Sequence, residues 1–161
     1  MSFEIPKENN PGKINEVVLG ATPAEGGTRS TKIKIGGWNS LQNMNFEGSH
    51  PNKTVIAMEV FDKAPSKLPN VFSDYFGSVI DKPADMAKKC VEEYGAEMIS
   101  VRLEGTHPEK GNRSVEEAAD VVKSVLEAVK APLIITGHNN YAKNNDVLKK
   151  MCEVTAGENC L

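Results

Sequence analysis

The sequence has few cysteines, no long hydrophobic run and no excess of basic charge. Its three cysteines, Cys90, Cys152 and Cys160, form no CxxC pair, which excludes a disulfide framework. They are also too few for the four thiolates of an iron–sulfur cluster or a Cys₄ zinc site. The longest apolar runs, residues 54–61 and 132–135, are far shorter than the roughly 20 residues of a membrane helix. With 19 basic and 22 acidic residues and no basic stripe, the chain is expected to have neither a membrane nor a nucleic acid as its partner.

The N-terminus and the length indicate the cellular compartment and the number of domains. Residues 1–10 are polar and lack the apolar segment of a secretory signal, which together with the cysteine usage predicts a reduced, cytoplasmic chain. A length of 161 residues is enough for one domain with a real core.

Residues 1–53 differ in pattern from the rest of the chain. Residues 17–19 and 33–35 are short strand-like runs, and the loop between them is too long for a tight hairpin. We expect a two-stranded β cap and a linker at one end of a larger fold. Gly26 and Gly27 do not suit a phosphate cradle, because no helix start follows them.

From residue 54 onward, a strand, a loop and a helix follow one another repeatedly. The predicted strands are rich in β-branched residues and comprise residues 54–61, 98–103 and 132–136. Residues 63–80 contain two prolines and are interpreted as a long loop.

The helices that follow these strands have recognisable starts. Ser114 and Glu117 form a capping box, in which each side chain bonds the other residue's backbone N–H. We expect the other two helices to begin after Asp81 and after Asn144 or Asn145. An apolar stripe on the middle helix is predicted to pack against the second strand, and it comprises Val115, Ala119, Val122, Leu126 and Val129, facing Ile99, Val101 and Leu103. Cys90 and Cys152 lie on similar stripes and are interpreted as inert core thiols.

Alternating strands and helices predict right-handed βαβ units and a parallel sheet. Each unit takes about 35 residues, so a complete (β/α)₈ barrel would need about 280. Residues 54–161 therefore form either an open doubly wound sheet or the N-terminal part of a TIM barrel, truncated after about three β/α units. In both cases residues 159–161 are interpreted as the start of a fourth strand.

Side-chain alternation divides the predicted strands into an aliphatic face and a polar face. Glu59, Arg102, Glu104 and His138 lie on the polar face, which would be the lumen of a barrel. Arg102 is predicted to lie within roughly 4 Å of Glu59 or Glu104. A solvated sheet face with ordinary ion pairs is the alternative.

Polar residues at the strand ends are candidates for ligand contacts. Asp62, Glu104 and Asn139 follow the three predicted strands, and ligands bind at this end of a parallel barrel. His107 and His138 follow successive strands and can approach each other, but their spacing matches no metal motif. The sequence contains no serine–histidine elbow, P-loop or GxGxxG motif, and no catalytic residue is assigned.

Several short motifs together resemble one known family. They are VVLGAT (residues 17–22), GGTRS (26–30), FEG (46–48), VIAMEV (55–60), EYGA (93–96), LEG (103–105), PE (108–109), DVL (146–148) and AGEN (156–159), with Gly137 between them. From about residue 16 to 161, the sequence resembles the small (delta) subunit of the corrinoid iron–sulfur protein. That protein is part of the acetyl-CoA decarbonylase/synthase (CO dehydrogenase/acetyl-CoA synthase) system. Residues 41–45 and 138–140 depart from the pattern of the family, and the family's chain is roughly twice as long.

The resemblance implies a TIM barrel related to pterin-dependent methyltransferases. It implies a non-catalytic methyl-carrier subunit that shares a corrinoid with a large subunit, and that large subunit carries the iron–sulfur cluster. The methyl group comes from methyltetrahydropterin through a methyltransferase and goes to acetyl-CoA synthase. This chain would hold no cluster of its own. The implied corrinoid contacts are the strand-end residues Asp62, Glu104, Gly105, Thr106, His107, Gly137, His138 and Asn139.

Two other functions remain open. One is a pterin-dependent TIM-barrel methyltransferase that acts on a corrinoid protein, in which strand-end Asp or Asn side chains would bind the pterin. The other is an interaction module that binds no ligand.

Overall fold

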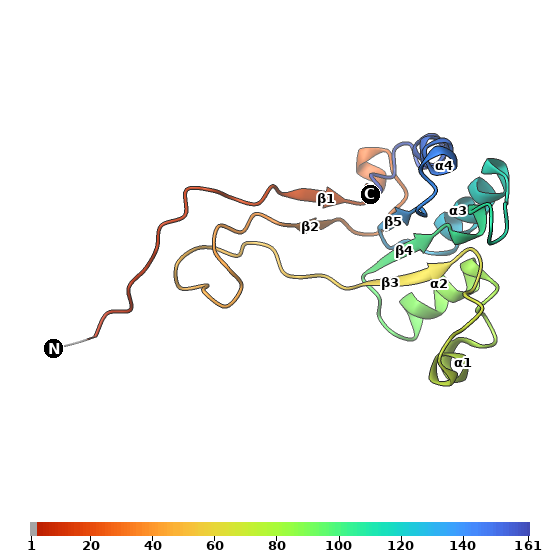
Figure 1. Cartoon of the computed structure of the whole chain (residues 1–161). Coiled ribbons are helices and arrows are strands. Elements are labelled where there is room, and N and C mark those ends of the chain that lie inside the picture. Colours follow the sequence, from red (N-terminus) through yellow and green to blue (C-terminus); the bar gives the residue numbers. More distant parts are fainter. Residues whose placement is uncertain (1–2) are drawn as a thin grey trace. The chain divides into compact units, whose positions relative to one another are not determined.

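The computed structural model describes residues 3–161, which divide into two compact units. The first comprises residues up to 18 together with residues 33–55, and the second comprises residues 19–32 and 56–161. Residues 19–32 therefore group with the α/β part of the chain rather than with the rest of residues 1–53. Figure 1 shows the order of the elements along the chain.

The two short strands predicted near the N-terminus are present. β1 (Val17–Leu19) and β2 (Ile33–Ile35) pair in a two-stranded sheet, and a single 3-10 turn, η1 (Pro23–Glu25), lies in the loop between them. In the first unit, the Trp38 indole stacks on the His50 ring with centroids 4.4 Å apart. The indole N–H donates to the Asn52 carbonyl oxygen at 2.7 Å, which fixes the chain after β2.

The second unit is built on a parallel sheet whose strands follow one another in sequence order, β3 (Ala57–Phe61), β4 (Met98–Arg102) and β5 (Leu133–Thr136). Each strand lies inside the run that the sequence predicts. Three long helices accompany them, α2 (Pro83–Glu92), α3 (Val115–Ala128) and α4 (Tyr141–Val154) (Figure 1). α2 packs beside α3, and α3 packs beside α4. No helix within residues 3–161 combines the length and the apolar character needed to cross a membrane.

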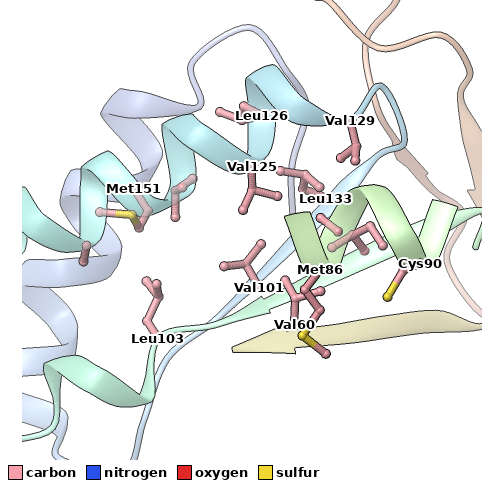
Figure 2. Packing of buried hydrophobic residues seen from close by; sticks show 14 of the residues in the cluster. Val60, Met86, Cys90, Val101, Leu103, Val125, Leu126, Val129, Leu133 and Met151 are labelled. Atoms are coloured by element: carbon pink, nitrogen blue, oxygen red, sulfur yellow. The ribbon is translucent and has the colours of Figure 1, made fainter. Parts of the chain in front are cut away.

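The core lies between one face of this sheet and the three helices, as Figure 2 shows. Ile99 and Val101 of the central strand, and Leu103 directly after it, are fully buried, and the apolar stripe of α3 packs against them as predicted. α2 and α4 contribute Met86 and Met151 to the same cluster. These three long helices therefore cover the same sheet face, and the opposite face, which none of the three covers, is called the helix-free face below.

The helix starts are only partly as predicted. The Ser114–Glu117 capping box is confirmed, with the Ser114 hydroxyl oxygen accepting from the Glu117 N–H at 3.1 Å. The prediction of Asp81 as a cap was wrong: Lys82 precedes α2 without a side-chain bond, and Pro83 occupies the first turn.

The prediction of Asn144 or Asn145 as the cap of the last helix was also wrong. α4 begins earlier, and Asn140 caps it by accepting from the Lys143 N–H. The Asn144 side chain instead accepts from the His138 N–H at 3.1 Å. Asn140 therefore takes the capping role that spacing alone assigns to Asn144 or Asn145.

Residues 63–80, interpreted as a loop, contain a short helix, α1 (Asn70–Phe76). In this helix the rings of Phe72 and Phe76 stack with their centroids 4.9 Å apart. Pro69 occupies the N-cap position, so it precedes the helix and does not break it. Of the two thiols predicted to be buried, Cys90 is buried, whereas Cys152 on α4 is exposed.

Residue 161 pairs with β5. Its N–H donates to the Leu133 carbonyl at 3.2 Å, and its carbonyl accepts from the Ile135 N–H at 2.7 Å. This is the hydrogen-bond pattern of a parallel neighbour, in agreement with the predicted start of a fourth strand.

Candidate functional site

The candidate site lies at the carboxyl ends of the three parallel strands. The register aligns Phe61 of β3 with Arg102 of β4, and Arg102 with Thr136 of β5. Because the strands are parallel and in register, the segments that follow them leave the sheet at one edge. These segments contain every residue that the sequence analysis singles out as a ligand contact.

A chain of charged groups runs along the helix-free face to this edge. Arg102 Nη1 lies 3.5 Å from a Glu59 carboxylate oxygen, and Arg102 Nη2 lies 3.1 Å from Glu104. The predicted proximity of Arg102 to these acids is confirmed. Lys110 contacts the other Glu104 oxygen at 2.6 Å, and this bond, with the Arg102 charge, lowers the pKa of Glu104. A groove of about 680 Å³ lies over these residues, with Phe61 in its wall.

Asp62 directs its carboxylate into the chain rather than toward a ligand. It is 2% exposed and accepts from the Gly105 N–H at 2.8 Å. Arg113 Nη1 lies 3.7 Å from the same carboxylate, and burial raises the pKa of Asp62. Thr106 is also buried, and its hydroxyl donates to the Leu103 carbonyl at 2.8 Å. The Asp62 carboxylate therefore ties the end of β3 to Gly105, and the Thr106 hydroxyl bonds back to Leu103, so that both fix the turn after β4.

The two strand-end histidines do approach each other. The His107 and His138 rings lie edge to face, with centroids 5.1 Å apart. His138 is only 8% exposed, and among residues 3–161 its Nε2 is a buried side-chain atom without a hydrogen-bond partner. Burial, followed by the neighbouring His107, lowers the pKa of His138.

The turn after β5 holds His138 from two sides. The His138 N–H donates to Asn144 Oδ1 at 3.1 Å, and the Asn140 N–H donates to His138 Nδ1 at 3.1 Å. A Cβ at Gly137 would collide with the Asn144 side chain, so the turn requires glycine there. Asn139 lies in the same turn and is exposed.

The structure thus divides the predicted contacts into two groups. Asp62, Gly105 and Thr106 are buried and bonded internally, and Gly137 is packed against Asn144. Glu104, His107 and Asn139 are half-buried or exposed, and His138 is buried with an unpaired ring nitrogen.

Three supporting residues did not emerge from the sequence: Lys110, Arg113 and Asn144. Arg113 directly precedes the capping box at Ser114, and from this position its side chain reaches Asp62, the residue that follows β3. Within the described part of the chain, no three His, Cys, Asp or Glu side chains gather closely enough to hold a metal ion. The strand-end groups described above donate and accept hydrogen bonds.

Comparison with known proteins gives a consistent result. Residues 16–161 match the family described as CO dehydrogenase/acetyl-CoA synthase delta subunit. The acetyl-CoA decarbonylase/synthase complex subunit delta of Archaeoglobus fulgidus is 42% identical over 156 residues, which are 97% of this chain and 34% of that protein. The subunit of the same name from Methanocaldococcus jannaschii is 38% identical over 161 residues, or 100% of this chain and 39% of that protein. The subunit of the same name from Methanothermobacter thermautotrophicus is 38% identical over 159 residues, which are 99% of this chain and 39% of that protein. The chain therefore spans well under half the length of these curated relatives.

Proposed function

Because the chain belongs to the CO dehydrogenase/acetyl-CoA synthase delta subunit family, we propose that it contributes the corrinoid-facing part of a methyl-carrier subunit. The observation that carries the proposal is the family match, which extends over both units of the chain. In this role the chain is a non-catalytic component of an acetyl-CoA decarbonylase/synthase complex.

The proposed architecture is the first part of a TIM barrel. The strand order β3–β4–β5 is sequential, and all three long helices cover the same face of the sheet. A doubly wound sheet reverses its strand order and places helices on both faces, whereas a barrel places every helix outside. The helix-free face with Glu59, Arg102 and Glu104 then becomes the lumen.

The strand-end groups fit a corrinoid. A corrin ring carries amide side chains around its edge, which need hydrogen-bond donors and acceptors rather than a metal-binding cluster. Glu104 and Asn139 supply acceptors, and Asn139, His107 and His138 supply donors. When bound, the cobalt of the corrinoid would carry the methyl group, and these residues would orient the ring edge and exclude water from it.

The proposed partners follow from the same role. A large subunit with an iron–sulfur cluster would hold the other side of the corrinoid. A methyltetrahydropterin methyltransferase would supply the methyl group, and acetyl-CoA synthase would receive it, in the cytoplasm.

Co-expression with a large subunit tests this proposal. We expect a red corrinoid to co-purify with the pair and to be lost when the large subunit is omitted or the strand-end groups are replaced. A purified pair that contains no corrinoid, even after reconstitution with one, would overturn the proposal.

Methyl transfer from methyltetrahydropterin by this chain alone would instead favour the methyltransferase alternative. Asp62, the aspartate expected to bind a pterin, is buried and bonded to Gly105, which does not favour that alternative.

A further inference from the structure

We propose that His138 is a dedicated hydrogen-bond donor of the strand-end site, which donates from Nε2 to a neutral carbonyl oxygen of the ligand, such as a corrin side-chain amide. This inference rests on the proposed function for the identity of the ligand. It rests on the structure for the chemistry of His138.

The tautomer of His138 follows from its backbone neighbour. The Asn140 N–H can only donate, and it does so to His138 Nδ1 at 3.1 Å. Nδ1 must therefore be the unprotonated nitrogen, which places the proton of the neutral ring on Nε2. The Nε2–H group is buried and has no acceptor within the described residues. A buried donor without an acceptor is costly, and native structures rarely contain one unless a ligand or water supplies the acceptor.

The donor is also held in place before any ligand binds. Asn144 Oδ1 accepts from the His138 backbone N–H, Asn140 holds the ring nitrogen, and the His107 ring packs edge to face against the imidazole. With both backbone and ring fixed, the side chain loses little conformational freedom when it donates to a ligand. This is the arrangement of a recognition group rather than of a solvent-facing histidine.

The surrounding charges favour a neutral acceptor over an anion. The charged and titratable groups that act on His138 are His107, Glu104, Lys143 and Asp62. Two of these are carboxylates, and the cation among them, Lys143, donates to Asn112 Oδ1 at 2.7 Å. Placing an anion against a buried neutral imidazole beside these carboxylates would be costly, whereas an amide carbonyl carries no charge that they would repel.

A titration of the full chain with dicyanocobinamide, whose corrin side chains are amides, tests the proposal. Long-range ¹H–¹⁵N NMR of labelled histidines reports which ring nitrogen of His138 carries the proton. We expect the Nε2–H form in the free chain and a saturable shift of this signal as cobinamide is added. Finding the proton on Nδ1, or a doubly protonated ring at neutral pH, would overturn the inference independently of any ligand.

Two variants separate the donor from the shape of the side chain. His138→Phe keeps a planar ring but removes the donor, and we expect cobinamide binding to weaken on the order of tenfold. His138→Gln retains an N–H donor and is expected to bind closer to the wild type. Circular dichroism melts of both variants establish that each is folded under the conditions of the titration. Equal binding by the folded Phe variant and the wild type would overturn the role of His138 alone.

The acid form of the probe tests the nature of the acceptor. Dicyanocobyrinic acid has carboxylates in place of the amides, and we expect weaker binding than for cobinamide, with no rise in the pKa of His138. Tighter binding of the acid with a raised pKa would overturn the neutral acceptor. No binding of cobinamide by the wild-type chain, either alone or with its large subunit, would overturn the proposed function as well.

Discussion

The Arg29 guanidinium lies 2.8 Å from the Glu158 carboxylate, although the arginine side chain is only 1% exposed. The same guanidinium donates to the Leu126 carbonyl at 2.9 Å and to the Val129 carbonyl at 2.7 Å. These carbonyls lie at the C-terminal end of α3, where the helix leaves its last acceptors without partners. Arg29 therefore ties residues 19–32 to the end of α3, and the GGTRS motif has a structural role here.

We predict that Arg29→Met destabilises the chain by about 3–5 kcal/mol, because it leaves Glu158 and two buried carbonyls without their partner. Urea unfolding followed by circular dichroism measures the loss. Arg102→Met is the matched control: Arg102 is 40% exposed, so its ion pairs contribute at most about 1 kcal/mol. Similar losses for both variants would contradict the structural role of Arg29.

The Glu158 side of this pair predicts a dependence on pH. Burial raises the pKa of Glu158, but hydrogen bonds from Thr28 and the Arg29 charge outweigh it and leave the pKa below its ordinary value. Because the pKa of Glu158 is lower in the folded chain than in the unfolded chain, its ionised carboxylate stabilises the fold at pH values above the unfolded pKa. This contribution to the free energy of unfolding is lost as the pH falls. We expect the wild type to exceed Glu158→Gln in unfolding free energy at pH 7, with the difference shrinking below about pH 4. A difference that is constant over this range would contradict the pairing.

Features of this fold that depend on residues close together in the sequence could largely be predicted, whereas most features that depend on distant residues could not. The strands, the stripe of α3 and the Ser114 cap follow from patterns within a few residues, and all are present. The Arg102 ion pairs also follow, because strand alternation and a parallel register place Glu59 on the same face.

The roles of Arg29 and Asn144 do not follow from local pattern. Arg29 binds carbonyls about a hundred residues away, and nothing near it in sequence distinguishes it from a loop arginine. Asn144 looks like a helix cap, but Asn140 takes that place because the turn after β5 needs the Asn144 amide for His138. The unpaired Nε2 of His138 likewise depends on tertiary packing.

Asp62 predicts a second pH effect of opposite sign. Burial raises its pKa, although the Gly105 N–H and Arg113 act in the other direction. The folded chain then retains a proton that the unfolded chain has lost, so the wild type loses stability as the pH rises through this range. Asp62→Asn keeps an acceptor for Gly105 but does not titrate. We expect the Asn variant to gain stability relative to the wild type from about pH 4 upward, as measured by urea unfolding. Parallel stability curves would contradict the raised pKa.

The cap of α3 predicts a local loss of stability. The Ser114 hydroxyl accepts from the Glu117 N–H at 3.1 Å, so Ser114→Ala removes this bond and is expected to cost about 1 kcal/mol. Ser124→Ala is the matched control in the same helix, since Ser124 only donates to the Val121 carbonyl within the helix. Alanine favours a helix interior, so Ser124→Ala is expected to be neutral or slightly stabilising. Equal losses for the two serines would contradict the capping role.

Substitution of Gly137 tests how closely the turn after β5 is packed. A Cβ at this position would meet the Asn144 side chain, whose oxygen accepts from the His138 N–H. Gly137→Ala must therefore displace Asn144, at a cost of about 1–3 kcal/mol in unfolding free energy, and release the His138 amide. Amide hydrogen exchange at His138 measures that release directly, and we expect it to accelerate.

Gly12→Ala is the control for Gly137→Ala, because nothing lies within 4 Å of a Cβ built at Gly12. It is expected to change neither stability nor exchange at His138. The double variant Gly137→Ala, Asn144→Ala removes the collision together with the bond, so it should recover part of the stability while His138 still exchanges fast. If Gly137→Ala alone leaves the exchange at His138 slow, Asn144 does not hold this turn, and the fixed position of the His138 backbone loses its support.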